Sequence, residues 1–219
     1  MKVVLHACCG PCASACEPRL KEEGHEVVLF FSNCNIDTRE EFEKRLAQAR
    51  KLGAADGVEV VADTYDHADW LEKVAKGFEQ EPEKGARCAR CFRYSLARTA
   101  AWAAAHGYEA FTTSLTVSPH KVSPVVFAAG REAAAMGTVP SAAAMGTDPS
   151  AAAMGTDPAA AAMGTDPAAN EGRMGTDPLF LEVDFKKKDG FLRSLKRSSE
   201  LGLYRQAYCG CEFSRRTSS

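Results

Sequence analysis

Six of the nine cysteines form three close pairs that lie far apart along the chain. The pairs are Cys8 with Cys9, Cys88 with Cys91, and Cys209 with Cys211. Thiolates bind iron and zinc strongly, and two thiolates a few residues apart can chelate one centre. The chain is therefore expected to fold so that its beginning, middle and end converge on one metal pocket, which is also the expected active site.

Each pair taken alone leaves alternatives open. The Cys8–Cys9 pair could be buried structural cysteine, and Cys88–Cys91 fits a zinc knuckle, a redox dithiol or a cluster site equally well. The neighbouring Arg87, Arg90 and Arg93 are expected to help keep Cys88–Cys91 as thiolates. Six thiolates exceed the four that one tetrahedral ion or one cluster takes, so the surplus favours catalysis over a purely structural site.

Length and composition favour one globular catalytic domain. The 219 residues are 45% apolar and 8% aromatic, enough for a sizeable core. No apolar run approaches the roughly 18 residues that a membrane span needs, and residues 3–5 are too short for a secretion signal. We expect a cytoplasmic protein, in which reduced thiols serve metal binding or redox chemistry.

The formal net charge of -2 hides a basic C-terminal end. From Lys186 onward there are nine lysines or arginines against three acidic residues, Asp189, Glu200 and Glu212. A local excess of positive charge favours binding of a polyanion such as RNA. Solvated surface charge is the alternative interpretation.

Apolar runs alternate with helical patterns, which predicts an α/β fold with a mostly parallel sheet covered on both faces. We expect strands at residues 2–5, 27–31, 58–62 and 110–114, helices at residues 13–23, 39–52, 68–76, 92–106 and 191–201, and an extended segment at 179–185. Gly24 and Gly53 are expected to stop the first two helices. Ligands of such sheets bind at the carboxyl ends of strands, and the polar or thiol residues expected there are Cys8, Cys9, Asn33, Asp63 and Ser114.

A tandem repeat separates two parts of the chain. The unit Ala-Met-Gly-Thr-Asp-Pro recurs near Met145, Met154 and Met163, with variants at Met136 and Met174. Each unit predicts one or two helical turns, which are too short to be stable alone. The units also have too little apolar surface to stack on one another as a solenoid core. We expect residues 1–134 and 179–219 to form one catalytic domain, and residues 135–178 to form a flexible insertion without catalytic duty. A loosely helical surface loop is the alternative.

Six segments carry recognisable motifs: His6-Ala7-Cys8-Cys9-Gly10-Pro11, Phe31-Ser32-Asn33-Cys34-Asn35-Ile36, Cys88-Ala89-Arg90-Cys91, Leu115-Thr116-Val117-Ser118-Pro119-His120-Lys121, Phe185-Lys186-Lys187-Lys188-Asp189-Gly190-Phe191 and Gly202-Leu203-Tyr204-Arg205-Gln206-Ala207-Tyr208-Cys209-Gly210-Cys211. Together, and in this order, they resemble the QueH family of epoxyqueuosine reductases. The resemblance implies a Rossmann-like fold of the adenine-nucleotide-hydrolase (HUP) type and reduction of epoxyqueuosine to queuosine at the tRNA wobble position, the last step of queuosine synthesis. It also implies a 4Fe-4S cluster beside a mononuclear iron. The expected partners are tRNA that carries epoxyqueuosine and an electron donor such as a ferredoxin or flavodoxin.

The resemblance also implies roles for individual cysteines. It makes metal ligands of Cys8, Cys9, Cys88, Cys91, Cys209 and Cys211. Cys12 lies where relatives carry Cys or Asp, either of which ligates iron, so it is a seventh candidate. Cys16 and Cys34 are expected to be bystanders, and Cys34 departs from the family, whose members usually have Pro there.

Candidates for substrate contact are less distinctive. His120 could donate a proton or contact the substrate, and Lys121 could contact a phosphate. Alternatively, Ser118–Lys121 could be only a turn. Asn33 and Asn35 could bind nucleoside polar groups or merely stabilise their loop.

The C-terminal basic and aromatic residues are candidates for binding tRNA. The expected phosphate contacts are Lys186, Lys187, Lys188, Arg193, Lys196 and Arg197, of which about half would face the RNA, and Arg205 is a further candidate. Tyr204 and Tyr208 could stack on a flipped base, with core packing as the alternative for one of them.

Two other functions remain possible at this point. A cluster-dependent tRNA thiolase of the related ATP-pyrophosphatase fold would need a Ser-Gly-Gly-x-Asp-Ser-like phosphate loop, where this chain has Cys8–Cys12. A zinc-stabilised RNA-binding module without catalysis would need only the cysteine pairs and the basic end.

Overall fold

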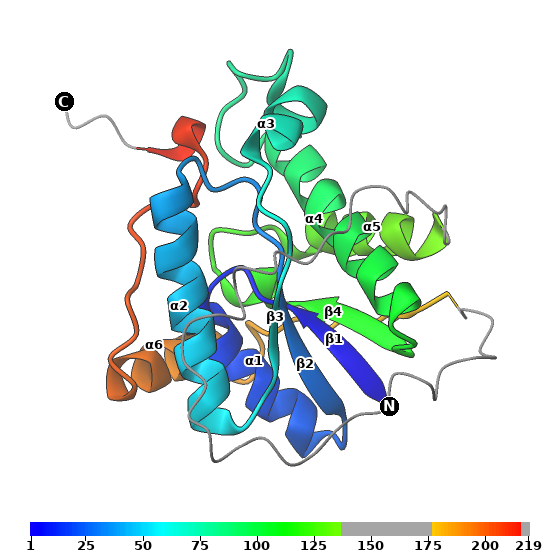
Figure 1. Ribbon diagram of the computed structural model, residues 1–219, viewed down its shortest axis with the longest axis vertical. Coiled ribbons are helices and arrows are strands. Elements are labelled where there is room, and N and C mark those ends of the chain that lie inside the picture. Colours follow the sequence, from blue (N-terminus) through cyan, green and yellow to red (C-terminus); the bar gives the residue numbers. More distant parts are fainter. Residues whose placement is uncertain (137–176, 216–219) are drawn as a thin grey trace, which may run out of the picture.

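Five parallel strands form one sheet in the order β3-β2-β1-β4-β5 (Figure 1). The computed structural model describes residues 1–136 and 177–215, so the expected insertion lies almost entirely outside the described residues. The strands are β1 (Lys2–His6), β2 (Glu26–Phe31), β3 (Val60–Ala62), β4 (Ala110–Thr113) and β5 (Leu179–Phe180). The α/β class and the parallel sheet expected from the sequence are confirmed.

The strand order creates a topological switch point beside β1. The chain runs from β1 outward to β2 and β3, and then returns to the other side of β1 to form β4. Val4 of β1 pairs with Val28 of β2 on one side and with Phe111 of β4 on the other. In open parallel sheets, the carboxyl ends of the two strands at such a point border the crevice in which ligands bind. Here those ends lead into Cys8 and Ser114.

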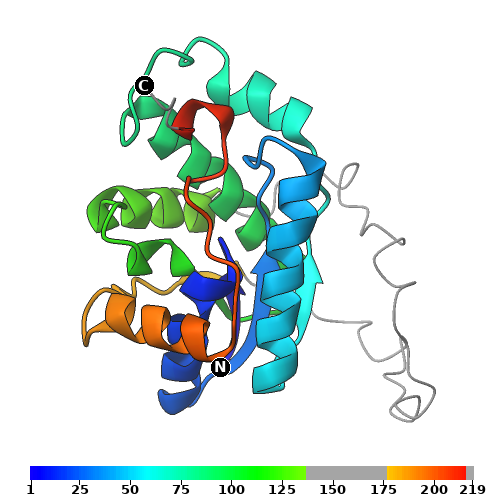
Figure 2. The same ribbon diagram turned by 90° about the vertical axis from the view of Figure 1, so that its left-hand side faces the viewer.

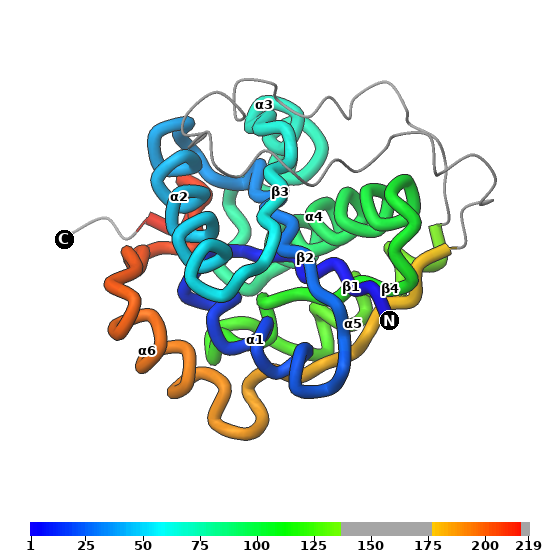
Figure 3. The backbone as a smooth tube through the Cα atoms, turned by 60° about the horizontal axis from the view of Figure 1, so that its bottom comes forward, coloured from blue at the N-terminus to red at the C-terminus, as the bar shows by residue number. Residues whose placement is uncertain are grey.

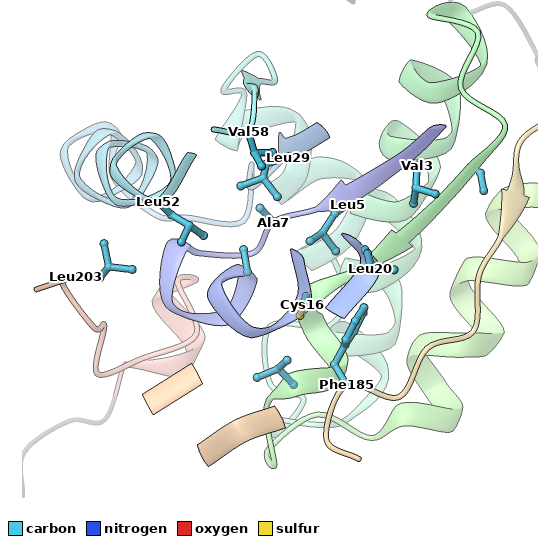
Figure 4. Packing of buried hydrophobic residues seen from close by; sticks show 13 residues of the cluster. Val3, Leu5, Ala7, Cys16, Leu20, Leu29, Leu52, Val58, Phe185 and Leu203 are labelled. Atoms are coloured by element: carbon cyan, nitrogen blue, oxygen red, sulfur yellow. The ribbon is translucent and has the colours of Figure 1, made fainter. Parts of the chain in front are cut away.

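Helices cover both faces of the sheet. They are α1 (Gly10–Glu22), α2 (Arg39–Asp56), α3 (His67–Trp70), α4 (Ala86–Ala105), α5 (Ser123–Ala135) and α6 (Gly190–Glu200), with a π-helix at Leu71–Ala75 and 3-10 turns at Ser114–Val117 and Glu212–Ser214. Because side chains alternate along β1, Val3 and Leu5 pack with α1, α2 and Phe185, whereas Val4 packs with α4 and α5. Figure 4 shows the first of these two cores, and Figure 3 shows α6 beside α1.

Several helix boundaries differ from those expected. α1 begins at Gly10, because Cys9 acts as its N-cap and Pro11 is tolerated in the first turn. α4 begins at Ala86, six residues before the expected start. The expectation that Gly53 ends α2 is wrong: the helix continues to Asp56 and ends at Gly57, whose φ is 62°.

The sequence pattern gave the wrong result for helices at two places, Gly53 and α5. Gly53 lies inside α2 because a Cβ there would collide with Val60, so its role is close packing rather than helix termination. α5 was not expected at all, although Pro124 in its first turn is a typical helix-start signal. None of the described helices is both long and apolar enough to cross a membrane.

The C-terminal segment returns along α2 to the carboxyl ends of the strands (Figure 2). Lys51 Nζ donates to the Gly202 carbonyl at 3.1 Å, and the Tyr204 amide donates to Gln48 at 2.9 Å. α2 therefore guides the last residues of the chain from α6 toward the switch point.

Candidate metal centre and active site

The first thiol group lies at the junction of β1 and α1. The Sγ atoms of Cys8, Cys9 and Cys12 all lie within 4.8 Å of one another, and no other such set of metal-binding side chains occurs in the described parts of the chain. Cys9 Sγ accepts a hydrogen bond from the Cys12 amide at 3.4 Å, which caps α1. Thiolates bound at about 2.3 Å to one tetrahedral ion are roughly 3.8 Å apart, so this group fits a single metal ion.

The environment of these sulfurs favours a shared negative charge. Hydrogen bonds from the thiols of Cys12 and Cys8, aided by Gln206, hold the pKa of Cys9 well below its ordinary value. The pKa of Cys12 is raised in turn, since its thiol hydrogen-bonds to Cys8 and Cys9. The amino end of α1 adds the positive end of a helix dipole.

Ser114, which follows β4, is hydrogen-bonded to Cys8, which follows β1, and so connects the two strands of the switch point beside the first thiol group. Its hydroxyl accepts from the Cys8 amide at 3.0 Å and donates to Cys8 Sγ at 3.3 Å. His6 lies behind the group at the end of β1, between Thr113 Oγ1 and the Ser32 carbonyl. Its burial lowers the pKa of His6 to about 4.

The second thiol group comes from α4 and the C-terminal segment. Cys88 and Cys91 lie in the first turns of α4, and Cys88 Sγ accepts from the Lys84 amide at 3.3 Å. Burial, followed by the nearby Cys209 and Cys211, raises the pKa of Cys91. The two remote pairs are therefore close enough to interact electrostatically.

Lys121 is the cation that reaches the second group. Its Nζ lies 2.9 Å from Cys209 Sγ. Burial lowers the pKa of Lys121, but the charge of Cys209 outweighs that effect and the net pKa is raised above its ordinary value.

The three arginines around Cys88–Cys91 form hydrogen bonds or ion pairs with groups other than these two cysteines. Arg87 donates to the carbonyls of Phe78, Glu79 and Glu81, Arg90 donates to the carbonyls of Lys73 and Val74, and Arg93 forms an ion pair with Glu132. The guanidinium groups of Arg87 and Arg90 hold the segment before α4 in place, and that of Arg93 joins α4 to α5. The charge of Arg87 also opposes the rise that burial causes in the pKa of Cys211.

Gly210 allows the last cysteine pair to turn into the site. Its φ is 135°, a conformation that favours glycine, and a Cβ there would lie 2.9 Å from Asn35 Nδ2 and 3.1 Å from Arg45 Nη1. Arg45 Nη1 in turn donates to the Cys209 carbonyl at 2.9 Å. The glycine is thus required by both backbone conformation and close packing.

The two thiol groups meet in a cavity of about 350 Å³ at the switch point. The site residues expected from the sequence that line it are Cys8, Cys9, Cys12, Cys91, Cys209, Asn33, Asn35, His120, Lys121, Arg205 and Tyr208. Cys88 lines a small adjoining hollow that shares His120 and Lys121 with the cavity. Cys211 is buried, and packs with Trp70.

Other expected site residues lie outside the cavity. Lys187 and Lys188 are exposed on the turn before α6, and Arg193 forms an ion pair with Glu22. Lys186 Nζ is used within the protein, where it donates to the Lys121 carbonyl at 2.9 Å. Tyr204 packs under the ammonium of Lys44, so of the two tyrosines it is Tyr208 that faces the cavity.

The two remaining cysteines direct their thiols at backbone carbonyls. Cys16 Sγ donates to the Cys12 carbonyl and Cys34 Sγ to the Thr64 carbonyl, each at 3.3 Å. Neither thiol lines the cavity. That they are bystanders stays a prediction.

Several cavity residues had no role assigned from the sequence. They are Glu83, Phe92, Ser95, Phe191 and Gln206. Gln206 stood inside a recognised motif, but nothing in the sequence indicated that its amide would lie against Cys9. Glu83 belongs to a loop whose path depends on the arginine contacts described above.

Comparison with known proteins decides the family. The family model described as "Epoxyqueuosine reductase QueH" matches residues 3–145 and 138–217. The chain belongs to the QueH family. A QueH of Dehalococcoides mccartyi is 29% identical over 215 residues, covering 97% of this chain and 92% of the relative. One from Streptococcus pyogenes serotype M1 is 27% identical over 217 residues, covering 96% of this chain and 69% of the relative. Membership of QueH confirms the expected enzyme class, an oxidoreductase.

Proposed function

We propose that the protein reduces epoxyqueuosine to queuosine at the wobble position of tRNA, using iron and sulfur bound by its cysteines. The observation that carries this proposal is the convergence of two thiol groups on one cavity at the switch point, in a chain of the QueH family. Curated relatives carry the name epoxyqueuosine reductase.

The thiols present fit two different centres. We assign the single iron to Cys8, Cys9 and Cys12, because three sulfurs this close suit one ion and leave a coordination position open. We assign the 4Fe-4S cluster to Cys88, Cys91, Cys209 and Cys211, because four thiolates match the number that such a cluster takes. When bound, these groups would supply electrons singly and a Lewis acid for the epoxide oxygen.

The reaction balances as the loss of the epoxide oxygen as water, with two electrons and two protons consumed and a carbon–carbon double bond formed. In this proposal His120, which is exposed at the mouth of the cavity, delivers a proton to the departing oxygen. Tyr208 and Phe191 supply the aromatic surfaces against which the modified base rests. A ferredoxin or flavodoxin would supply the electrons.

The polar groups of the cavity would orient the nucleoside. Asn33 Nδ2 donates to the Ala7 carbonyl at 2.9 Å, which leaves its oxygen to accept from the substrate. Asn35 lies beside Gly210 and lines the same cavity. Amide groups held in this way discriminate a substrate by hydrogen bonding, since an unmatched buried polar group is costly.

The basic end of the chain would hold the tRNA backbone. Lys187, Lys188 and Lys196 are exposed, and Arg205 joins this surface to the cavity. Contacts of this kind are electrostatic, so the affinity for tRNA should fall steeply with salt.

The decisive experiment is an anaerobic incubation of iron- and sulfide-reconstituted protein with tRNA that carries epoxyqueuosine and a chemical reductant, followed by nucleoside mass analysis. Queuosine formed by the wild type and absent with Cys209→Ser establishes the reaction. No conversion by protein with confirmed iron and sulfide rejects it in favour of another cluster chemistry, such as tRNA thiolation. Zinc as the sole metal would favour an RNA-binding module without catalysis.

A further inference from the structure

The ammonium of Lys121 has a sulfur atom as its anionic partner. Its Nζ lies 2.9 Å from Cys209 Sγ and 5.6 Å from the centroid of the Phe92 ring. Within the described ranges no carboxylate forms an ion pair with it. A charge taken partly out of water needs an opposite charge close by. Cys209 would supply that charge when it binds a metal as a thiolate.

The position of Lys121 is fixed from the other side by a second lysine. Lys186 Nζ donates to the Lys121 carbonyl at 2.9 Å and to Ser123 Oγ at 2.7 Å. These bonds join the segment before α6 to the turn before α5. The backbone from which the Lys121 side chain reaches Cys209 is therefore held in place by contacts within the protein.

We propose that Lys121 is a positioning residue that compensates the charge on the Cys209 sulfur, and thereby raises the reduction potential of the centre which that sulfur binds. The inference rests on the proposed function, because it needs a redox centre at Cys209. An added electron makes the centre more negative, so a cation held against a ligand sulfur stabilises the reduced state. Hydrogen bonds to ligand sulfurs act in the same direction. This role differs from the phosphate contact that the sequence suggested for Lys121.

The test compares Lys121→Met, Lys121→Arg and Lys76→Met by anaerobic spectroelectrochemical titration of the reconstituted proteins. Lys76 is a suitable control because it is exposed, pairs with Glu72, and lies outside the cavity. We expect the midpoint potential of Lys121→Met to fall by at least the 59 mV that corresponds to a tenfold change in a one-electron equilibrium. Lys121→Arg should recover most of the shift, and Lys76→Met should match the wild type.

Iron content and tRNA affinity of the same proteins separate the explanations. An unchanged potential in Lys121→Met would overturn the inference, and weaker tRNA binding by that variant would then indicate a phosphate contact. Loss of iron from Lys121→Met but not from Lys121→Arg supports charge compensation, whereas loss from both contradicts it. A wild type without any redox transition would reject the proposed function as well, which distinguishes that failure from a failure of the Lys121 role alone.

Discussion

Arg45 Nη1 donates a hydrogen bond to the carbonyl of Cys209, 2.9 Å away. The Arg45 side chain is 2% exposed, and its Nε pairs with Glu41 Oε1 at 2.7 Å. A residue in the middle of α2 thus holds the backbone of a cysteine near the C-terminal end. This contact explains how the last pair of thiols reaches a site built on β1 and α4.

Arg45→Met should therefore reduce both metal binding and stability. The variant leaves Glu41 without its buried partner and frees the Cys209 carbonyl, and breaking such a pair costs about 3 kcal/mol. We expect less iron per chain after reconstitution and a lower urea midpoint. Arg50→Met is the matched control, because Arg50 is exposed on the same helix. Full iron content in Arg45→Met would show that the C-terminal pair is positioned by other contacts.

Gly210→Ala tests the close approach between the last cysteine pair and the rest of the site. The new Cβ would press on Asn35 and Arg45, in addition to a backbone cost of about 1 kcal/mol for the positive φ. Gly24→Ala is the matched control, since Gly24 has a φ of 83° and nothing within 4 Å of the added atom. We expect Gly210→Ala to lose iron and Gly24→Ala to lose only stability. Equal iron content in both variants would mean that the loop adapts.

Serine substitutions should divide the cysteines into two classes. Cys88→Ser and Cys209→Ser should abolish activity and lower iron and acid-labile sulfide, because serine is a poor ligand for iron. Cys16→Ser should keep the activity and the iron and sulfide content, because a hydroxyl can still donate to the Cys12 carbonyl. Cys34→Ser should behave likewise, since its hydroxyl can donate to the Thr64 carbonyl. Full activity in either of the first two variants would remove that residue from the metal site.

The sequence predicted the sheet well because each expected strand is a short apolar run bounded by polar or glycine residues. It located the starts of α2, α3 and α6 to within one residue but missed those of α1 and α4, since the cap of α1 is a cysteine sulfur and the first turns of α4 contain the pair Cys88–Cys91. The direction of Lys121 could not be predicted. It depends on where the C-terminal segment crosses the switch point, and that crossing is set by α2 and not by residues near Lys121 in the sequence.

A buried carboxylate that does not line the cavity provides a test of pH dependence. Glu17 in α1 is buried, and burial raises the pKa of its carboxyl above the ordinary value of 4.5, an effect that neighbouring Asp56 increases and Lys21 opposes. An acid whose pKa is higher in the folded than in the unfolded state destabilises the fold while it is ionised. That penalty is present at pH 7 and disappears as the pH falls through the folded pKa toward 4.5.

Glu17→Gln should consequently be more stable than the wild type at pH 7, by about 1.4 kcal/mol for each unit of the pKa difference. The advantage should shrink as the pH approaches 4.5, and urea denaturation at several pH values measures it. Glu23→Gln, which removes an exposed ion pair with Arg19 on the same helix, should change little at any pH. A Glu17→Gln protein less stable than wild type at pH 7 would show that the ion pair with Lys21 outweighs burial.

The contacts between α5 and β5 predict the outcome of removing residues 137–176. Gly130 packs so closely on Phe180 that a Cβ would overlap its ring, and Arg131 Nη1 pairs with Glu182 Oε1 at 2.7 Å. The two sides of the excised segment are thus joined by residues that would remain, and the cysteines all lie outside it. Replacement by a short Gly-Ser linker should leave the iron content and melting temperature nearly unchanged. Gly130→Val, by contrast, should lower the melting temperature because it separates α5 from β5. Loss of iron from the linker variant would instead show that the repeat has a structural role.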